Sequence, residues 1–226
     1  MEFQGPAARD LANVYALNQA FLDVLRNADG QHVRTRPAID GLVKKLVALG
    51  RQRADHLARC PFLLFALAES EEWRWARLFD EQGPPDLVDR IECPSEASAR
   101  LAAAALGFLW ELAKRNPYAA RLVSGATLSW CEQLTDSSPV RLFQFAASEP
   151  RLLAPRLANR NEFWTKLLGA GSSHDKDIRH AAQLCALQTV LTMQMSERYR
   201  QLPAAACSMP VQAMRVADRR RRPPKN

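Results

Sequence analysis

The chain has 226 residues, of which 47% are hydrophobic, so it can bury the core of one large domain or two small ones and is not a disordered protein. Its net charge of +7 is concentrated at the C-terminal end, because residues 215–226, RVADRRRRPPKN, hold six basic residues and one acidic residue and so carry +5 of the total. A nucleic-acid-binding fold normally displays its basic residues as a patch on the folded surface. The first 214 residues carry only +2, which argues against that class.

The cysteines are widely spaced and form no C-x-x-C pair, so the sequence predicts neither a zinc ribbon nor a thioredoxin-type redox site. They are Cys60, Cys93, Cys131, Cys185 and Cys207. The first ten residues, MEFQGPAARD, lack the basic start and apolar run of a secretory signal. The longest uncharged stretch, residues 181–196, is shorter than the roughly 20 apolar residues of a membrane-spanning helix. We therefore expect a cytoplasmic protein with reduced thiols and no membrane partner.

In the first half of the chain, apolar residues at helical spacing, with Asp-Gly, Pro and Gly at the ends, predict several helices. These cover residues 11–25, a stretch from Pro37 that ends just before Gly50, and a stretch that begins near 51. Pro61 either kinks the third helix or starts another. The FLLFAL that follows, residues 62–67, is apolar on all sides and is predicted to lie buried in a helix that continues to about Phe79. The segment DEQGPPD, residues 80–86, is the clearest loop and the best candidate for a boundary between two subdomains.

In the second half, the pairs Asn116-Pro117 and Ser138-Pro139 have the residue types that cap and start helices. We expect helices over residues 95–115, 117–134, 139–147, 150–158, 161–168 and 173–200. No segment alternates between apolar and polar residues as a strand does. The sequence therefore predicts an all-α fold, an irregular bundle of about nine or ten helices without a sheet. Residues 1–214 would form a single helical domain, and residues 215–226 a disordered basic tail.

The segment SSHDKDIRH, residues 172–180, holds two of the four histidines. His174 and His180 are six residues apart and separated by about 9 Å of helix rise, whereas helical two-histidine metal sites use i and i+4 spacing. We interpret the segment as a helix start with Ser172 or Ser173 as its cap and with aspartates placed favourably for the helix dipole. The sequence thus predicts no metal and no other cofactor.

Residues 118–134, YAARLVSGATLSWCEQL, resemble in part the helix-turn-helix of bacterial repressors, in which an A-x-x-A helix leads through a short turn into a recognition helix. The turn is shorter than in that family, and no Lys or Arg occurs between Arg121 and Arg141. Such a helix would not neutralise phosphates or reach guanine edges. We interpret the segment as one continuous buried helix in which Gly125 marks close packing against another helix.

Trp73 and Trp75 lie two residues apart in a predicted helix, so their side chains point about 200° away from each other. One helix face therefore cannot bury both. The second ring either meets another layer of the same domain or serves as an exposed anchor for another protein, since Trp is enriched in interface hot spots.

Nucleotide-binding loops, the G-x-S-x-G elbow and the H-E-x-x-H motif are absent from the sequence. We therefore predict a non-enzymatic cytoplasmic helical protein that acts as an adaptor or regulator by binding another protein, with Trp73 and Trp75 as candidate partner-binding residues. One alternative is a helical domain that binds or senses a small ligand in an apolar pocket. Another is a nucleic-acid-associated protein that uses the tail. The candidate polyanion-binding residues are then Arg219, Arg220, Arg221 and Arg222.

Overall fold

The computed structural model describes residues 5–26, 37–80, 96–149 and 151–201. The helices are α1 (Ala8–Arg26), α2 (Pro37–Val47), α3 (Arg51–Ala58), α4 (Glu72–Asp80), α5 (Ala97–Arg115), α6 (Pro117–Ser124), α7 (Leu128–Asp136), α8 (Pro139–Ser148), α9 (Asn161–Gly169), the 3-10 turn η2 (Ala170–Ser172) and α10 (Lys176–Gln201). The strands are β1 (Phe65–Ala66) and β2 (Ala154–Pro155). The predicted all-α fold is thus confirmed, with one two-residue strand pair added to it.

The chain divides into two compact units, Met1–Leu191 and Thr192–Asn226, and α10 contributes residues to both. Helices α1 to α9 and both strands belong to the first unit. Residues 81–86 of the predicted boundary loop and the whole basic tail lie outside the described residues. The single-domain interpretation, the boundary at 80–86 and the disorder of the tail therefore stay predictions.

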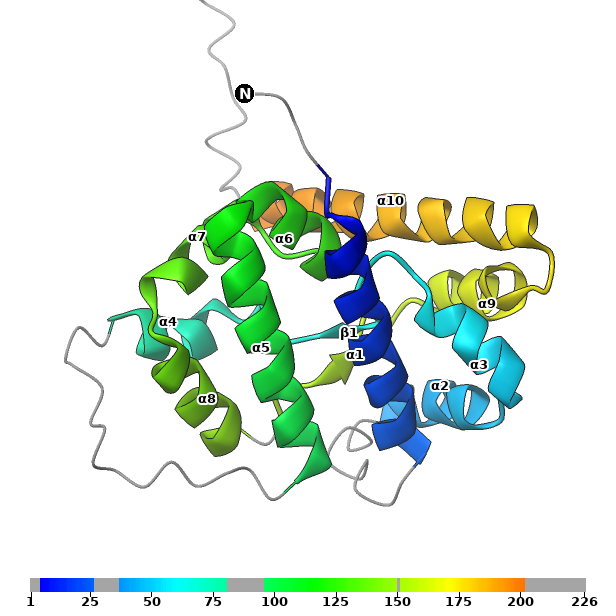
Figure 1. The fold of residues 1–226 in the computed structure, drawn as a ribbon, viewed down its shortest axis with the longest axis horizontal. Coiled ribbons are helices and arrows are strands. Elements are labelled where there is room, and N and C mark those ends of the chain that lie inside the picture. The colour runs from blue at the N-terminus through cyan, green and yellow to red at the C-terminus, as the bar shows by residue number, and fades with distance from the viewer. Residues whose placement is uncertain (1–4, 27–36, 81–95, 150, 202–226) are drawn as a thin grey trace, which may run out of the picture. The chain divides into compact units, whose positions relative to one another are not determined.

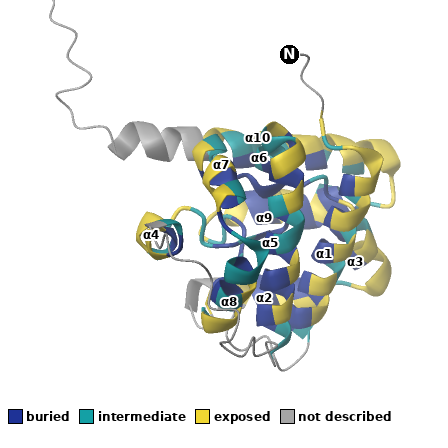
Figure 2. Ribbon diagram, turned by 60° about the vertical axis from the view of Figure 1, so that its left-hand side comes forward, coloured by how far each residue is buried: buried dark blue, intermediate teal, exposed yellow. Residues whose placement is uncertain are grey.

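Helices α1 and α5 lie side by side at the centre of this unit (Figure 1). Helix α5 also contacts α6, α7 and α8, while α1 contacts α2 and α3. The core-facing side of α5 is built largely from small residues, with Ala102, Ala103 and Ala105 buried. Short side chains let neighbouring helices approach closely, which explains how one helix packs against four others. Figure 2 shows the resulting burial along α5 and α1.

Two helices begin where their capping pairs predicted. The Asn116 side chain accepts a hydrogen bond from the backbone N–H of Ala119 at 3.0 Å, and α6 starts at Pro117. The Ser138 hydroxyl accepts one from the N–H of Arg141 at 3.3 Å, and α8 starts at Pro139. Each cap satisfies an N–H group that the first helical turn leaves without a partner.

The prediction that FLLFAL lies in a helix was wrong. Helix α3 ends at Ala58 and α4 begins only at Glu72, so residues 62–67 run as a mostly extended segment. Phe62, Leu63, Leu64 and Phe65 are nevertheless completely buried, as the apolar composition indicated. Within the segment, β1 pairs antiparallel with β2, with Phe65 opposite Pro155 and Ala66 opposite Ala154.

An extended segment in a core needs partners for its backbone polar groups, and distant residues supply them. The amide of buried Asn18, in α1, donates to the carbonyl oxygens of Phe62 at 2.9 Å and Ala58 at 3.1 Å, and its oxygen accepts from the N–H of Leu64 at 2.8 Å. The guanidinium of Arg156 donates to the carbonyl oxygens of Leu63 at 2.8 Å and Phe65 at 2.5 Å. These side chains take the role that helical hydrogen bonds would otherwise play.

The predicted helix over residues 150–158 was also wrong. Its described part, from Arg151 on, consists of turns around β2. Proline at 155 disfavours helical geometry at Ala154, and its neighbour Arg156 donates its backbone N–H to the carbonyl of Leu64 at 2.9 Å. The segment therefore lies along β1 and does not form a separate helix.

Candidate interaction surface

Helix α4 places its two tryptophans on opposite sides, as their spacing predicted. Trp75 is 1% exposed, whereas Trp73 is 71% exposed. Figure 2 shows this helix buried on one side and exposed on the other. Trp73 is the most exposed of the large apolar side chains in the described part of the chain.

The buried tryptophan belongs to an aromatic cluster. The Trp75 ring lies 4.9 Å from that of Phe145, 5.0 Å from Trp130 and 5.7 Å from Phe79, measured between ring centroids. Its indole N–H donates to the carbonyl oxygen of Ala68 at 2.9 Å. These contacts fix α4 against α7 and α8, so the position of Trp73 on the surface follows from the packing of Trp75 two residues later.

Trp73 is held on one side by its neighbour in sequence. The guanidinium carbon of Arg74 lies 4.8 Å from the centre of the Trp73 ring, within the range of a cation–π interaction. Arg74 in turn pairs with Glu71 at 3.0 Å and with Glu149 at 2.5 Å, and its side chain is only 13% exposed. Burial by itself lowers the pKa of Arg74, but the hydrogen bonds and charges of Glu71 and Glu149 outweigh it and raise the pKa above its ordinary value. The cation beneath the ring is therefore permanent and fixed in place.

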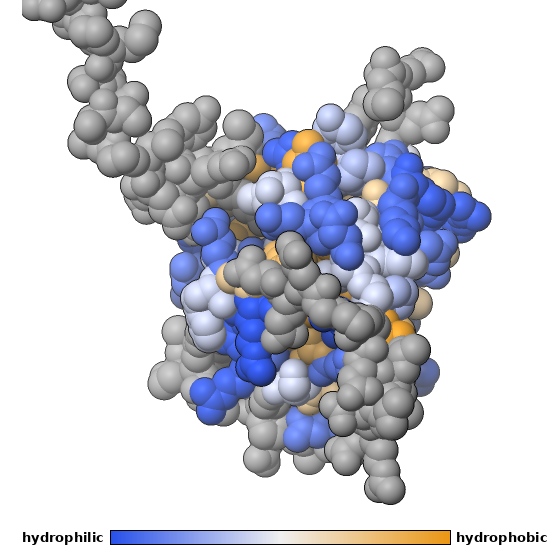
Figure 3. All heavy atoms as spheres, turned by 90° about the vertical axis from the view of Figure 1, so that its left-hand side faces the viewer, coloured by the Kyte–Doolittle hydropathy of each residue, from blue (hydrophilic) through white to orange (hydrophobic). Residues whose placement is uncertain are grey.

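The surroundings of Trp73 are polar. The charged residues Glu72 and Arg77 are exposed beside it on α4, and Figure 3, which faces this side of the molecule, shows hydrophilic residues on parts of the described surface. The exposed indole of Trp73 is therefore bordered on α4 by charged side chains.

The interpretation of residues 118–134 as one continuous helix was wrong. Helix α6 ends at Ser124, Gly125 adopts the left-handed conformation with φ of 65°, and α7 begins at Leu128 with Thr127 as its cap. The predicted close packing at Gly125 is confirmed, because a Cβ there would overlap Val190 of α10. Trp130 is 5% exposed and its indole belongs to the aromatic cluster around Trp75, so the side of α7 that carries Trp130 packs in the core.

The histidine segment forms a helix start, with a different cap from those expected. Asp175 caps α10, because its carboxylate accepts from the N–H groups of Asp177 at 2.9 Å and Ile178 at 3.1 Å. The hydroxyl of Ser172 instead donates to the carbonyl of Leu168 at 2.6 Å. His174 meets His56 of α3, with ring centroids 5.3 Å apart. Over the described residues, no group of three or more His, Cys, Asp or Glu side chains is arranged to hold a metal ion.

The described cysteines are free thiols. Burial raises the pKa of Cys60, and burial above all raises that of Cys131 to about 12. Both are therefore protonated at neutral pH and poor nucleophiles. Cys185 is exposed on α10, and Cys93 and Cys207 lie outside the described residues.

A buried ion pair that the sequence did not indicate lies at the turn before α4. Arg156 pairs with Glu69 at 2.7 Å, and the two side chains are 5% and 6% exposed. Glu69 also accepts from the backbone N–H of Leu67 at 2.6 Å. The pair fixes the turn that leads from β1 into α4. Nothing local to residue 156 marks it, because its partners lie about 90 positions earlier.

Arg219, Arg220, Arg221 and Arg222 lie outside the described residues, so their role as polyanion-binding residues stays a prediction. Among the described helices, none is long and apolar enough to span a membrane. No protein-family model, no curated protein and no solved structure matches the chain.

Proposed function

We propose that this protein is a non-enzymatic adaptor or regulator that binds another protein through α4, with Trp73 as the anchor. The exposed indole of Trp73 is the observation that carries the proposal. The free thiols Cys60, Cys131 and Cys185 are compatible with a reducing compartment, which supports our proposal that the protein acts in the cytoplasm.

Two features of the surface support binding at this position. Trp73 projects from a helix whose opposite side is locked into the aromatic cluster, so the anchor stands on a rigid base. The indole is further restrained by Arg74, which limits the rotamer freedom that it loses on binding. The packing of Trp75 against its aromatic neighbours favours this proposal over a small-ligand pocket in the same region.

The test is an affinity pull-down from native cell extract, followed by binding measurements on the proteins recovered. Replacement of Trp73 by Ala removes the anchor and is expected to weaken binding by at least about 2 kcal/mol, or roughly 30-fold in Kd. Because the ring is exposed, the free energy of unfolding should change by less than about 0.5 kcal/mol.

Tyr118→Ala is the matched control, because Tyr118 is an exposed aromatic residue, 45% accessible, on α6. It should recover the same partners as the unaltered chain. If Trp73→Ala also recovers every partner at unchanged affinity, the surface of α4 is not the binding site and the proposal fails.

A further inference from the structure

Helices α2 and α3 carry a concentration of positive charge that the rest of residues 1–214 does not share. Residues 44–59 hold five basic residues and one acidic residue, Asp55, for a net charge of +4, whereas residues 1–214 as a whole carry only +2. That average, which argued against a nucleic-acid-binding fold, hides the concentration. We define the five basic residues as the α2–α3 basic surface: Lys44, Lys45, Arg51, Arg53 and Arg59.

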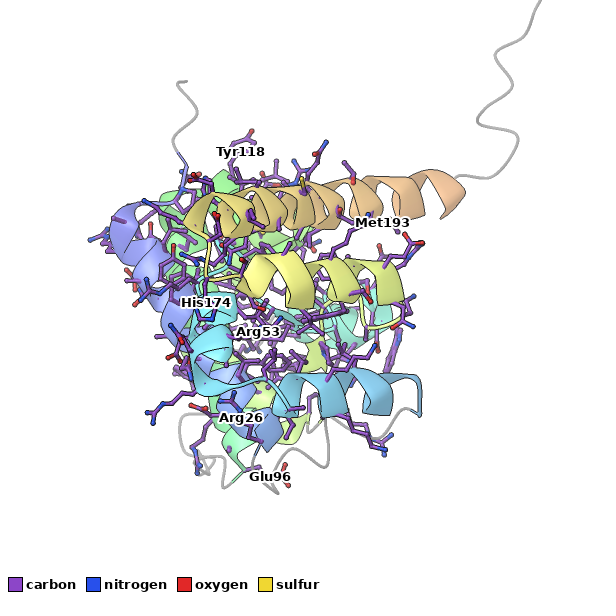
Figure 4. The ribbon with its side chains drawn as sticks, turned by 90° about the vertical axis from the view of Figure 1, so that its right-hand side faces the viewer. Arg26, Arg53, Glu96, Tyr118, His174 and Met193 are labelled. Atoms are coloured by element: carbon purple, nitrogen blue, oxygen red, sulfur yellow. The ribbon has the colours of Figure 1, made fainter. Side chains whose placement is uncertain are left out.

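All five residues of the α2–α3 basic surface are exposed. Helix α2 ends at Val47 and α3 begins at Arg51, so only three residues separate the two helices and their cations lie on neighbouring elements. In Figure 4, α2 and α3 both lie on the side that faces the viewer, with Arg53 where α3 adjoins α9. None of the five is paired with a carboxylate in the described part of the chain. Their charge is therefore open to an anionic partner.

Contacts inside the domain hold the part of this surface that α3 provides. Arg53 donates to the hydroxyl of Ser172 at 3.0 Å and to the carbonyl oxygen of Leu168. A different side of α3 packs into the core through its buried residues, Ala54, Leu57 and Ala58. Arg53 therefore presents its charge from a fixed position, which reduces the side-chain entropy that is lost on binding.

The composition of the surface favours a nucleic-acid backbone over an acidic protein or a lipid surface. Among the described residues from 41 to 60, Val47 is the only large apolar side chain that is exposed. A protein interface has an apolar or aromatic centre, and a helix that lies on a membrane inserts an apolar face, whereas phosphate contacts require only cations and polar donors. Residues 41–60 also contain no Phe, Tyr or Trp on which the bases of a single strand could stack. These features favour a duplex.

We propose that the protein binds double-stranded DNA through the α2–α3 basic surface, by contacts with phosphates and without sequence preference. Duplex DNA carries one negative charge per about 1.7 Å of its axis, so several exposed cations meet a continuous run of phosphates. Recognition of duplex RNA adds hydrogen bonds to 2′-hydroxyl groups, for which Gln52 is the only exposed uncharged polar side chain among residues 44–59. DNA is therefore the better match. Trp73 lies on α4, outside this surface, so DNA is a second partner of the proposed adaptor.

Fluorescence anisotropy of a labelled DNA duplex, titrated with the full-length chain at several salt concentrations, tests the proposal. Lys44→Gln combined with Arg51→Gln removes two cations of the surface and leaves residues 215–226 in place. Loss of two phosphate contacts should raise the Kd at least about tenfold at about 50 mM salt and reduce the slope of log Kd against log salt by about 1.8. The matched control is Arg9→Gln combined with Lys114→Gln, which removes one arginine and one lysine that are exposed on α1 and α5. It lowers the net charge equally and should change the Kd by less than about twofold.

Circular dichroism of both double variants should match that of the unaltered chain, because all four residues are exposed. Absence of duplex binding at about 50 mM salt contradicts the proposal. So does an unchanged Kd in the chain with Lys44→Gln and Arg51→Gln, which would assign the binding to residues outside the surface. An equal loss of affinity in both variants would reflect net charge alone and would also overturn it. Poly-glutamate, single-stranded DNA or an RNA duplex of the same length that binds more tightly than the DNA duplex would contradict the assignment to DNA.

Discussion

Replacement of Asn18 by Leu tests whether the buried extended segment depends on one side chain. Asn18 is completely buried in α1, and its amide bridges the carbonyl oxygens of Phe62 and Ala58 while accepting from the N–H of Leu64. Leucine has nearly the same volume, so the substitution removes the hydrogen bonds without leaving a large cavity. The segment from Ala58 to Leu64 would then keep its buried polar groups without these partners.

The size of the effect follows from the groups left unpaired. A buried donor without a partner costs about 1 to 3 kcal/mol, which applies to the N–H of Leu64. Each of the two carbonyl oxygens, Phe62 at 2.9 Å and Ala58 at 3.1 Å from the amide nitrogen, adds about 1 kcal/mol. We therefore expect the free energy of unfolding to fall by about 3 to 5 kcal/mol, a large part of the about 5 to 15 kcal/mol of a typical domain.

The assay is equilibrium unfolding in urea, followed by far-ultraviolet circular dichroism. Asn13→Leu is the matched control, because Asn13 is exposed on the same helix and its replacement should change stability by less than about 0.5 kcal/mol. If Asn18→Leu lowers the free energy of unfolding by less than about 1 kcal/mol, the segment does not depend on this amide, and the account of its extended conformation is wrong.

Three further predictions concern other parts of the fold. Glu69→Leu leaves the guanidinium of Arg156 buried without its counter-ion and should destabilise the protein by about 3 to 5 kcal/mol in urea unfolding. Gly125→Ala places a Cβ at a positive φ and against a side chain of α10, so we expect a loss of about 2 to 4 kcal/mol in the same assay. The pKa of Asp10 is lowered, because hydrogen bonds and nearby arginines outweigh the effect of burial, which raises it. At pH values above the ordinary carboxyl pKa near 4, ionised Asp10 therefore stabilises the fold. This stabilisation is lost as the pH falls through the lowered folded-state pKa of Asp10. Asp10→Asn should thus make the free energy of unfolding depend less on pH in that acid range.

Each of these predictions has a control in the chain. Glu72→Leu changes an exposed carboxylate in the same region as Glu69 and should have little effect. Gly41→Ala lies in α2 with no atom within 4 Å of the added Cβ, so it should be neutral or stabilising. An Asp10→Asn chain whose stability varies with acid pH as steeply as that of the unaltered protein would show that Asp10 is not responsible.

Local signals were sufficient for much of the helical framework. Asn116-Pro117 and Ser138-Pro139 each contain a cap and a helix-starting proline, so α6 and α8 begin where the sequence indicated. The same reasoning missed the break at Gly125, because a glycine inside an apolar helical pattern is compatible with either a continuous helix or a left-handed C-cap. The choice between them depends on the packing of α6 and α7 against α5, which no local window contains.

The exposed side of α4 around Trp73 was likewise predicted only in part from the sequence. The spacing of Trp73 and Trp75 by itself determined that one helix face could not bury both, since that is a property of helix geometry. Only the tertiary structure decided which ring is exposed, because Phe145 and Trp130 come to Trp75 from other helices. Glu149, which fixes Arg74 beneath Trp73, lies 75 residues away in sequence.

Composition and periodicity thus determined the all-α class, most helix positions and the burial of FLLFAL. The conformation of that segment was decided by Asn18, which lies 40 and 44 positions from the carbonyl groups it binds, and by Arg156, which lies more than 90 positions from its own. The physical reason is that an apolar run satisfies the hydrophobic effect equally well as a helix or as an extended strand. Backbone hydrogen bonding separates the two, and here its partners come from residues that only folding brings together.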